Sequence, residues 1–291
     1  MRMLVAAIAL LGLSAQAPAY RAEIEKYRAD RLAELKDDYG FLTLAGLYWL
    51  KPGDNTAGSA KGNDFVLPSK APARLGVFTL KGERVFFVAA PSATVTSEGK
   101  PITEREMSVE WRERRALVCG DLLMFPITRG DKIAIRMRDL KSEKRAAFPG
   151  LKYYPIRPAY RVTAAFTPHA QPKKIPIANV LGQLIEMESP GLLTFTLQGR
   201  TMTLEPVYED ERRQDLFLIF TDPTSRDKTY QAGRYLHAPL PKDGTVIVDF
   251  NKAYSPPCAF NEFATCPLPP KQNRLPVRLE AGELRTRSET I

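Results

Sequence analysis

The sequence has few of the residues on which most metal and redox sites depend. Among its 291 residues are two histidines, three cysteines and two tryptophans. The patterns C-x-x-C and H-E-x-x-H, which place two ligands on one metal ion, are both absent. We therefore expect neither a bound metal nor a cofactor.

Three motifs of nucleophilic and nucleotide chemistry are missing as well. The chain has no G-x-S-x-G, the sharp turn that presents the serine of α/β-hydrolases. It also lacks Walker A and G-x-G-x-x-G, the glycine-rich loops that hold phosphates in many nucleotide-binding proteins. These absences argue against a serine hydrolase of that type and against a nucleotide-binding domain.

Long hydrophobic runs are absent except for one at the beginning of the chain. Arg2 precedes ten largely apolar residues, 4–13, and the small residues Ala17 and Ala19 follow. This is the layout of a secretory signal peptide, and we expect cleavage after Ala19, with Tyr20 as the first mature residue. A membrane anchor is the alternative, but ten apolar residues are too few for a bilayer core that needs about 20. We predict an exported protein, periplasmic or secreted, with no transmembrane segment in the mature chain.

Positive charge is in excess but is scattered along the chain. The formal net charge is +9 at pH 7, and the densest basic stretch, 129–145, is interrupted by acidic residues. Residues 133–138 alternate apolar and charged, as a half-buried strand does, so we expect a solvated strand face there. Attraction to anionic envelope surfaces or to anionic ligands is the alternative. No nucleic-acid recognition motif accompanies the charge, and with the predicted export this argues against a nucleic-acid partner.

The mature chain begins with a helical pattern and continues with strand patterns. Apolar residues recur at helical spacing from Tyr20 to Leu35, and Gly40 ends the pattern soon after. Short segments rich in β-branched and aromatic residues follow, separated by turn-forming residues. They are residues 41–50, 65–68, 76–80, 84–89, 93–97, 115–119, 122–127 and 132–138. Many short strands at such spacing are typical of a β-sandwich.

A charged stretch followed by prolines marks a domain junction near residue 149. Strand patterns then resume, and two of them, joined by Gln-Gly-Arg, predict a hairpin over 192–206. These later strands are expected at 160–166, 173–180, 191–197, 201–208, 216–222 and 245–250. We therefore predict a mainly β protein with an N-terminal helix and two β units. In order, the segments are the signal peptide 1–19, the helix 20–40, a β-sandwich 41–148, an antiparallel β-barrel or sandwich 149–285 and a tail 286–291.

One stretch of the first unit resembles a known β-sandwich. Residues 58–80, GSAKGNDFVLPSKAPARLGVFTL, are similar to the opening of a forkhead-associated domain, with Asn63, Asp64, Phe65 and Leu67 in the matching places. The arginine and the Ser-x-x-His that belong to that family's pattern are missing here. The resemblance therefore implies a sandwich architecture and gives no support for phosphothreonine recognition.

A longer stretch resembles the bacterial and archaeal family catalogued as the domain of unknown function DUF1684. The resemblance is carried by residues 220–283, FTDPTSRDKTYQAGRYLHAPLPKDGTVIVDFNKAYSPPCAFNEFATCPLPPKQNRLPVRLEAGE, and extends back to GLYWLKPGDNTAG at 46–58. It implies a common fold over most of the mature chain. Because the family has no established function, it implies no activity and no catalytic residues.

The polar and aromatic residues best placed to bind a ligand lie on the two sides of the strand expected at 245–250. They are Tyr230, Arg234, Tyr235, Asp249, Asn251 and Tyr254. An arginine among tyrosines can hold a carboxylate or phosphate in two hydrogen bonds beside a stacking surface. Flanking prolines would preorganise such a pocket. We predict a small anionic or polar ligand there; the alternative is structural, with Arg234 paired to Asp249 to fix the loop.

Two cysteines lie in the loop that follows this strand. Cys258 and Cys266 are close enough in sequence for a disulfide in an oxidising compartment, and closing this loop would contribute about 2.5 kcal/mol. A competing hypothesis makes Cys258 a nucleophile, with His237 as base and Asp249 as orienting group. An acid/base pair of Asp222 and Asp249 is a further alternative. A third class of function is a non-catalytic module that docks an envelope protein.

Overall fold

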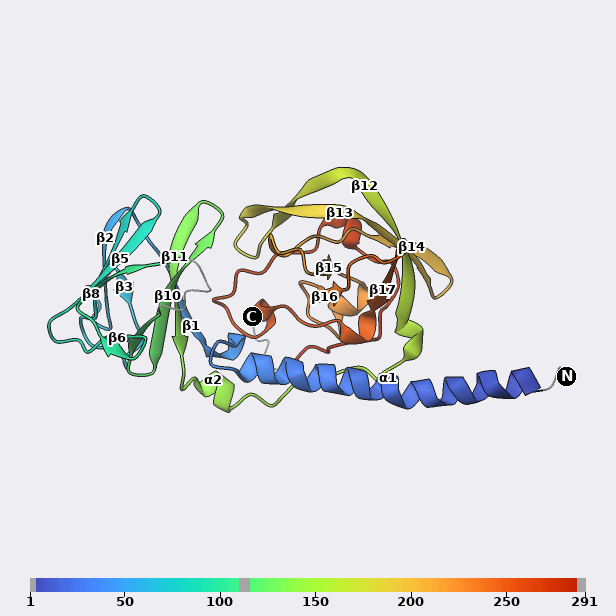
Figure 1. The fold of residues 1–291 in the computed structure, drawn as a ribbon. Coiled ribbons are helices and arrows are strands. Elements are labelled where there is room, and N and C mark those ends of the chain that lie inside the picture. Colours follow the sequence, from blue (N-terminus) through green and yellow to red (C-terminus); the bar gives the residue numbers. More distant parts are fainter. Residues whose placement is uncertain (1–3, 110–115, 287–291) are drawn as a thin grey trace. The chain divides into compact units, whose positions relative to one another are not determined.

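The structure is a computed structural model that describes residues 4–109 and 116–286, with side chains from residue 18 onward. The chain divides into two compact units. We call Leu35–Phe148 the sandwich unit, and Met1–Glu34 together with Pro149–Ile291 the C-terminal unit. Both are built mainly from antiparallel strands, and a helix opens the chain (Figure 1). The predicted mainly β fold class is confirmed.

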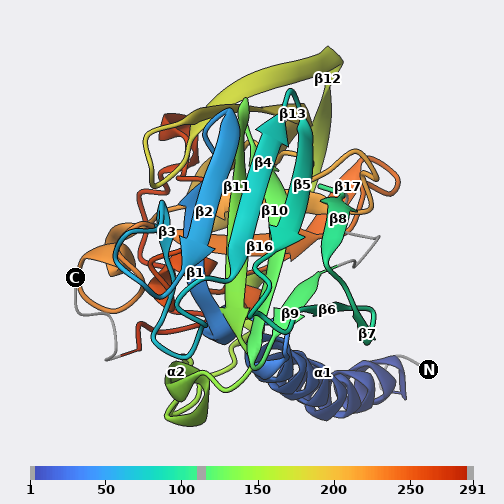
Figure 2. The same cartoon turned by 90° about the vertical axis from the view of Figure 1, so that its left-hand side faces the viewer.

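The sandwich unit contains two sheets in the part of the chain that the structure describes (Figure 2). One has the strand order β1-β11-β10-β9-β6-β7 and the other β3-β2-β4-β5-β8. The first sheet comprises β1 Leu44–Trp49, β6 Thr96–Ser97, β7 Lys100–Pro101, β9 Leu117–Cys119, β10 Leu122–Arg129 and β11 Lys132–Asp139. The second comprises β2 Gly53–Gly58, β3 Phe65–Val66, β4 Gly76–Lys81, β5 Arg84–Ala89 and β8 Glu104–Met107. Short helices are η1 Phe41–Thr43 and α2 Glu143–Ala146.

Side chains from both sheets form one core in the sandwich unit. Phe78 and Phe87 of the second sheet are fully buried and belong to the same cluster as Ile135 and Met137 of the first. These residues occupy alternate positions along β4, β5 and β11, the period that turns every second side chain toward one face of a sheet. The short strands that the sequence predicts here therefore form a face-to-face sandwich.

The charged face of β11 is buried, which corrects the expectation of a solvated face. Arg136 and Arg138 are only 6% and 3% exposed. Arg138 donates hydrogen bonds to the carbonyl of Gly40 and, at 3.0 Å, to the hydroxyl of Thr43. Burial lowers the pKa of Arg138 to about 10. Alternation located the strand, but only the fold brings the segment containing Gly40 and Thr43 over its charged side.

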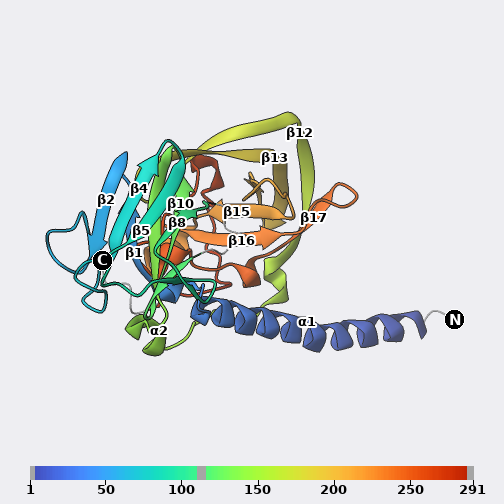
Figure 3. The same ribbon diagram turned by 60° about the vertical axis from the view of Figure 1, so that its left-hand side comes forward.

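The C-terminal unit contains a four-stranded sheet, β14-β13-β12-β17, and the antiparallel pair β15-β16 (Figure 3). Its strands are β12 Arg161–Ala178, β13 Leu184–Leu197, β14 Arg200–Leu204, β15 Leu216–Phe220, β16 Arg234–Ala238 and β17 Thr245–Asp249. Single turns of 3-10 helix are η3 Pro158–Tyr160, η4 Pro223–Arg226, η5 Phe250–Lys252, η6 Pro257–Ala259 and η7 Lys271–Asn273. Within the described residues these sheets are open, and no closed barrel is formed.

Strands β12 and β13 form one long hairpin. The sequence predicted two separate strands, 160–166 and 173–180, but β12 runs through both, with an irregular register between Pro168 and Lys173. Only the stretch 161–165 of β12 pairs with β17, so the rest of β12 is an edge strand, where prolines are tolerated. The predicted hairpin of β13 and β14 is confirmed, with Leu197 opposite Arg200.

The core of the C-terminal unit is closed partly by irregular chain. Phe220 of β15 and Phe250 of η5 are fully buried, and their rings meet edge to face at 5.6 Å. Leu275, Val277 and Leu279, which lie beyond the last strand, belong to the same cluster. The final segment is therefore a structural part of this unit.

Helix α1, Leu4–Lys36, packs on the C-terminal unit through the face predicted from residue 20 onward (Figure 1). Ile24 is fully buried, and the Tyr27 hydroxyl donates to the carbonyl of Lys252 at 2.9 Å. Of the predicted signal peptide, residues 1–3 lie outside the described residues. Among the described helices, none is long and apolar enough to cross a membrane.

Candidate functional site

Arg234 is fully buried and fixes the last segment of the chain. Its guanidinium lies 2.9 Å from the carboxylate of Asp222 and donates to the carbonyls of Leu279, at 3.0 Å, and Ala281. The Asp222 carboxylate also accepts the backbone N–H of Leu279 at 2.9 Å. The structural interpretation of Arg234 therefore fits this geometry, but its partner is Asp222 rather than the predicted Asp249.

Asp249 and Asn251 together hold Tyr20 of helix α1. The two carboxylate oxygens of Asp249 accept the Tyr20 hydroxyl at 3.0 and 2.9 Å, and the Asn251 amide donates to the same hydroxyl at 2.9 Å. Asn251 also hydrogen bonds to the backbone N–H and C=O of Arg157. These two residues form a convergent polar site, and a tyrosine of the same chain occupies it.

The three other predicted binding residues are tyrosines, and two of them donate hydrogen bonds to the loop that contains Cys258 and Cys266. The Tyr235 hydroxyl donates to the carbonyl of Pro267 at 2.6 Å, and the Tyr230 hydroxyl donates to the carbonyl of Cys258 at 3.3 Å. The ring of Tyr254 packs edge to face on Tyr235 at 5.8 Å. Burial raises the pKa of Tyr235 and Tyr254, so both stay neutral hydrogen-bond donors.

His237 lies between a carboxylate and a tyrosine hydroxyl. Its Nδ1 is 3.1 Å from Asp215, and its Nε2 is 2.9 Å from the hydroxyl of Tyr254. The ring stacks on Phe217 at 4.9 Å. Because both ring nitrogens have partners, His237 is held in one orientation.

The hypothetical triad of Cys258, His237 and Asp249 is not assembled by these contacts. His237 uses its two nitrogens on other residues, and Asp249 is engaged by Tyr20 and Asn251. Likewise, Asp222 and Asp249 serve different networks rather than one acid/base pair. General-base activation requires the base within hydrogen-bond reach of its target, which this arrangement does not provide.

The predicted disulfide between Cys258 and Cys266 is not formed. Instead, the backbone N–H of Cys258 donates to the sulfur of Cys266 at 3.1 Å. Burial raises the pKa of the Cys266 thiol. A thiol kept protonated is a poor nucleophile, which disfavours its oxidation to a disulfide.

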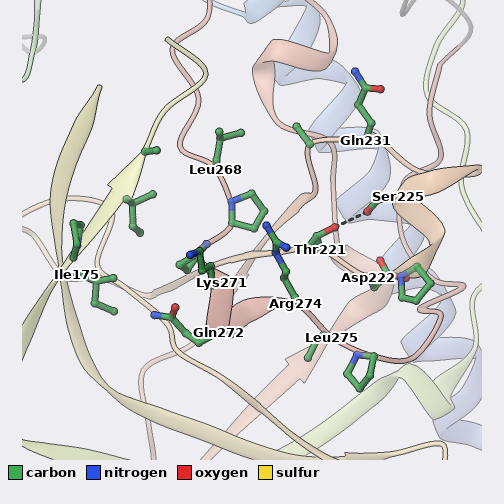
Figure 4. A pocket seen from close by; sticks show the side chains of 18 of the residues that line it. Ile175, Thr221, Asp222, Ser225, Gln231, Leu268, Lys271, Gln272, Arg274 and Leu275 are labelled. Carbon is green, nitrogen blue, oxygen red and sulfur yellow. Dashed lines mark hydrogen bonds between the residues drawn. The ribbon is translucent and has the colours of Figure 1, made fainter. Parts of the chain in front are cut away.

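A cavity of about 1170 Å³ opens in the C-terminal unit, at a place that sequence analysis did not select. Its walls come from β12, from the segment around η4 and from the proline-rich stretch 268–276. Figure 4 shows Lys271, Gln272 and Arg274 projecting from that stretch, with Ile175 of β12 opposite them. None of the six residues predicted to bind a ligand lines this cavity, although Asp222, the partner of Arg234, does.

Cationic side chains dominate the charged part of the lining. They are Lys173, Lys174, Arg226, Lys271 and Arg274. The two lysines of β12 lie near carboxylates, at 3.8 Å from Glu205 and 3.3 Å from Glu186 respectively. The other three form no ion pair with any residue that the structure describes. The one carboxylate of the lining, Asp222, is already paired inside the protein. The cavity therefore presents uncompensated positive charge.

Buried polar contacts fix the wall that carries Lys271 and Arg274. Asn273, between them, is 1% exposed and donates to the carbonyls of Glu205 and Ile219 at 2.9 and 3.0 Å. Gln272 donates to the Glu205 carboxylate at 2.7 Å. The two cationic side chains therefore flank a pair of residues that anchors the segment to the rest of the unit.

Close backbone packing at Gly233 supports the same wall. Its φ of +102° favours glycine, and a Cβ there would lie 2.5 Å from the carbonyl oxygen of Phe220 and from Pro269. A larger residue would displace the proline from the cavity wall.

The second histidine does not form a catalytic relay. Nε2 of His169 is 3.1 Å from the Glu205 carboxylate and 3.4 Å from the hydroxyl of Ser189. A serine relay needs the carboxylate and the serine on opposite ring nitrogens, whereas both lie on the same one here. No group of three or more metal-ligating side chains occurs among the described residues.

The cavity lies within the part of the chain that matches a known protein family. The family described as "Protein of unknown function (DUF1684)" matches residues 146–284. The chain belongs to the DUF1684 family. The matched region contains every residue that lines the cavity, but it does not reach back to the stretch 46–58.

Two solved structures are similar to parts of this DUF1684 chain. An uncharacterized protein of Haloarcula marismortui, solved by NMR in solution, is 34% identical, with a TM-score of 0.42, covering 50% of this chain and 81% of that one. The FHA domain of FhaA, crystallised with the intracellular domain of another protein, is 16% identical, with a TM-score of 0.22, covering 32% of this chain and 97% of that one. Among curated proteins, none matches the chain.

Part of the cavity lining was detectable in the DUF1684 signature. Lys271 and Arg274 lie three residues apart within Pro-Pro-Lys-Gln-Asn-Arg-Leu-Pro, a segment already notable for its stiffness. Lys173 and Arg226 come from distant strands and loops, and no local pattern connects them. Their convergence depends on the tertiary fold.

Proposed function

We propose that this protein is exported and that it binds an anionic ligand in the cavity lined by Arg226, Lys271 and Arg274. The observation that carries the proposal is the convergence in one cavity of these three cations, which have no ion-pair partner among the described residues. Arginine and lysine side chains around a concave site attract anions and hold carboxylates or phosphates by charge-assisted hydrogen bonds. The net charge of +9 adds a favourable long-range field.

The apolar part of the lining indicates what else the ligand contains. Ile175, Ile177, Leu268 and Leu275 contribute to the walls, together with several prolines. Ligand sites typically combine such surfaces with a few fixed polar groups. The ligand class proposed is therefore an organic anion with an apolar body, rather than an inorganic ion.

The proline-rich wall supports affinity by limiting the cost of ordering. Pro269, Pro270 and Pro276 restrict φ in the wall that carries Lys271 and Arg274. A wall that is already fixed loses little conformational entropy when a ligand binds.

Binding can be tested by thermal shift and calorimetry with a panel of aliphatic and aromatic carboxylates and phosphate esters. At about 100 times its Kd, a ligand adds about 2.7 kcal/mol of stability, a shift of several degrees. The double variant Lys271→Ala, Arg274→Ala should lose the shift. Arg200→Ala, an exposed arginine on β14 outside the cavity, is the matched control and should keep it. The proposal fails if no anion shifts the wild type, or if the double variant binds as well as the control.

The export part of the proposal is supported by the leader-like residues 1–19. Cleavage after Ala19 would leave Tyr20 as the first residue, so its contacts with Asp249 and Asn251 would be kept. Sequencing the N-terminus of the protein recovered outside the cytoplasm should give Tyr20. Recovery only from the cytoplasm, with Met1 retained, would refute export.

A further inference from the structure

The turn between β12 and β13 displays a cluster of exposed aliphatic side chains. Val180, Leu181 and Leu184 are 37%, 48% and 71% exposed. They are three of the seven large hydrophobic side chains that are markedly exposed in the described part of the chain. Single exposed apolar residues are ordinary, but three within five residues of one turn need an explanation. We call residues 179–184 the hairpin tip.

A buried asparagine makes this tip rigid. Asn179 is 2% exposed, and its side-chain oxygen accepts the backbone N–H groups of Leu181, at 2.9 Å, and Gln183, at 3.0 Å. Its amide donates to the side-chain oxygen of Gln183 at 2.8 Å. The aliphatic side chains are therefore held in place on an ordered turn.

The remaining backbone N–H groups of the turn also have partners inside the protein. Asn179 donates to the carbonyl of Gln183, Gly182 donates to that of Asn179, and Val180 donates to that of Cys266 at 3.0 Å. With the two bonds to the Asn179 side chain, every N–H from 179 to 183 is satisfied without water. An unsatisfied N–H is costly to remove from water, which excludes most loops from apolar surroundings. The N–H groups of this turn can leave water without that cost.

Positive charge lies next to the tip. Leu184 lines the same cavity as Lys173, Lys174 and Lys271. The first two lie near Glu205 and Glu186, and Lys271 has no ion-pair partner among the described residues. The tip thus combines a small apolar surface with neighbouring lysines, whose long side chains can reach an anionic plane while the aliphatic groups enter it.

We infer that the hairpin tip docks this protein on an anionic phospholipid surface. Val180, Leu181 and Leu184 enter the interface between headgroups and acyl chains, and Lys173, Lys174 and Lys271 face the headgroups. A protein partner is a poorer fit, because stable protein interfaces bury about 1,200–2,000 Å², far more than three aliphatic side chains supply. A small apolar contact with lysines beside it is instead a good match for a negatively charged lipid surface.

Vesicle binding by the full chain tests this inference. Vesicles of phosphatidylcholine, with and without about one third phosphatidylglycerol, separate apolar from electrostatic contributions. Leu181→Ser should weaken binding to the anionic vesicles by about tenfold, because it removes one inserted aliphatic side chain. Leu240→Ser is the matched control, since Leu240 is 43% exposed in the same unit but is not part of the tip. High salt should weaken binding of the wild type.

A local readout is needed because the apolar residues 4–13 can bind vesicles on their own. In Leu181→Trp, brominated acyl chains should quench the added tryptophan, whereas in Leu240→Trp they should not. Equal vesicle binding by Leu181→Ser and Leu240→Ser, or no quenching of Leu181→Trp, would overturn the inference. Binding of a protein to the tip, without quenching of Leu181→Trp by the brominated lipid, would also overturn the inference.

The outcome is distinguishable from that of the proposed anion site. Val180 and Leu181 do not line the cavity, so Leu181→Ser should keep any thermal shift produced by an organic anion. Loss of both properties in Leu181→Ser, together with a lower melting temperature, would indicate damage to the hairpin. In that case Val180→Ser repeats the test at the neighbouring position.

Discussion

Glu283 is a buried carboxylate whose ionisation should destabilise the C-terminal unit. Its side chain is fully buried, and among the described residues no hydrogen bond of normal geometry reaches either carboxylate oxygen, although Ser255 lies near enough to lower the pKa of the group. Arg31 of helix α1 lies 3.9 Å away, too far for a hydrogen bond. Burial raises the pKa of Glu283 to about 7, and the positive charge of Arg31 together with the nearby Ser255 offsets this only in part.

The sign and size of the effect follow from proton linkage. Between its ordinary pKa of 4.5 and about 7, Glu283 holds a proton in the folded state that it releases on unfolding. The free energy of unfolding therefore falls as pH rises through this window. One pKa unit corresponds to about 1.4 kcal/mol, so the whole window is worth on the order of 3 kcal/mol. This stability is present below the ordinary pKa and is lost above about pH 7.

Glu283→Gln removes the ionisation while keeping the shape of the side chain. At about pH 8 the variant should be more stable than the wild type by up to about 3 kcal/mol, and at about pH 5 the two should differ little. Urea unfolding followed by circular dichroism measures both values. Glu34→Gln, at an exposed position of α1, is the control and should not change the pH dependence.

Two results would refute this reasoning. A wild-type stability that does not fall between about pH 5 and pH 8 would mean that Glu283 has no raised pKa. A Glu283→Gln variant less stable than the wild type at about pH 8 would mean that the ionised carboxylate and Arg31 form a net stabilising pair.

Three further predictions follow from the buried contacts. Arg234→Ala should lower the free energy of unfolding by about 3–5 kcal/mol, because it leaves Asp222 buried without its counter-charge. Calorimetry should show a lower melting temperature, and an unchanged melting temperature would refute the structural role. Tyr20→Phe should lower the free energy of unfolding by about 1–3 kcal/mol, because it leaves Asp249 and Asn251 without their shared partner. The variant should also be cleaved faster by a protease within α1, and cleavage at the wild-type rate would contradict this. Mass spectrometry of the unreduced protein after alkylation should find three alkylated cysteines, and a single alkylated cysteine would show a disulfide instead.

Local pattern was sufficient for the mainly β class and for several individual elements. The strand β5 falls at 84–89, where the β-branched and aromatic residues predicted it, because such side chains pack well on an extended backbone. Strand β16 was missed, since Arg234, which opens it, is charged and fully buried. Its burial depends on Asp222 and on carbonyls near the chain's end, which no window of sequence around it contains.

For the predicted binding residues too, the sequence indicated the chemical type of each group, but only the structure showed what each group contacts. Asp249 and Asn251 were recognised as groups that could converge on one partner, and they do converge. That partner, Tyr20, is more than two hundred residues away in the sequence, so only the docking of α1 could identify it. The sequence therefore showed that these groups could bind a polar partner, but it did not show which residue that partner is.

By itself, the sequence determined many of the short strands, the N-terminal helical pattern, the family and the stiffness of the proline-rich segment, because each depends on neighbours along the chain. Only the tertiary structure decided that Arg234 is a buried support, and that Lys173, Arg226 and Arg274 share one cavity. The physical reason is that burial and charge pairing depend on distances in space. In this chain those distances are set by strand pairings and buried contacts between residues far apart in sequence.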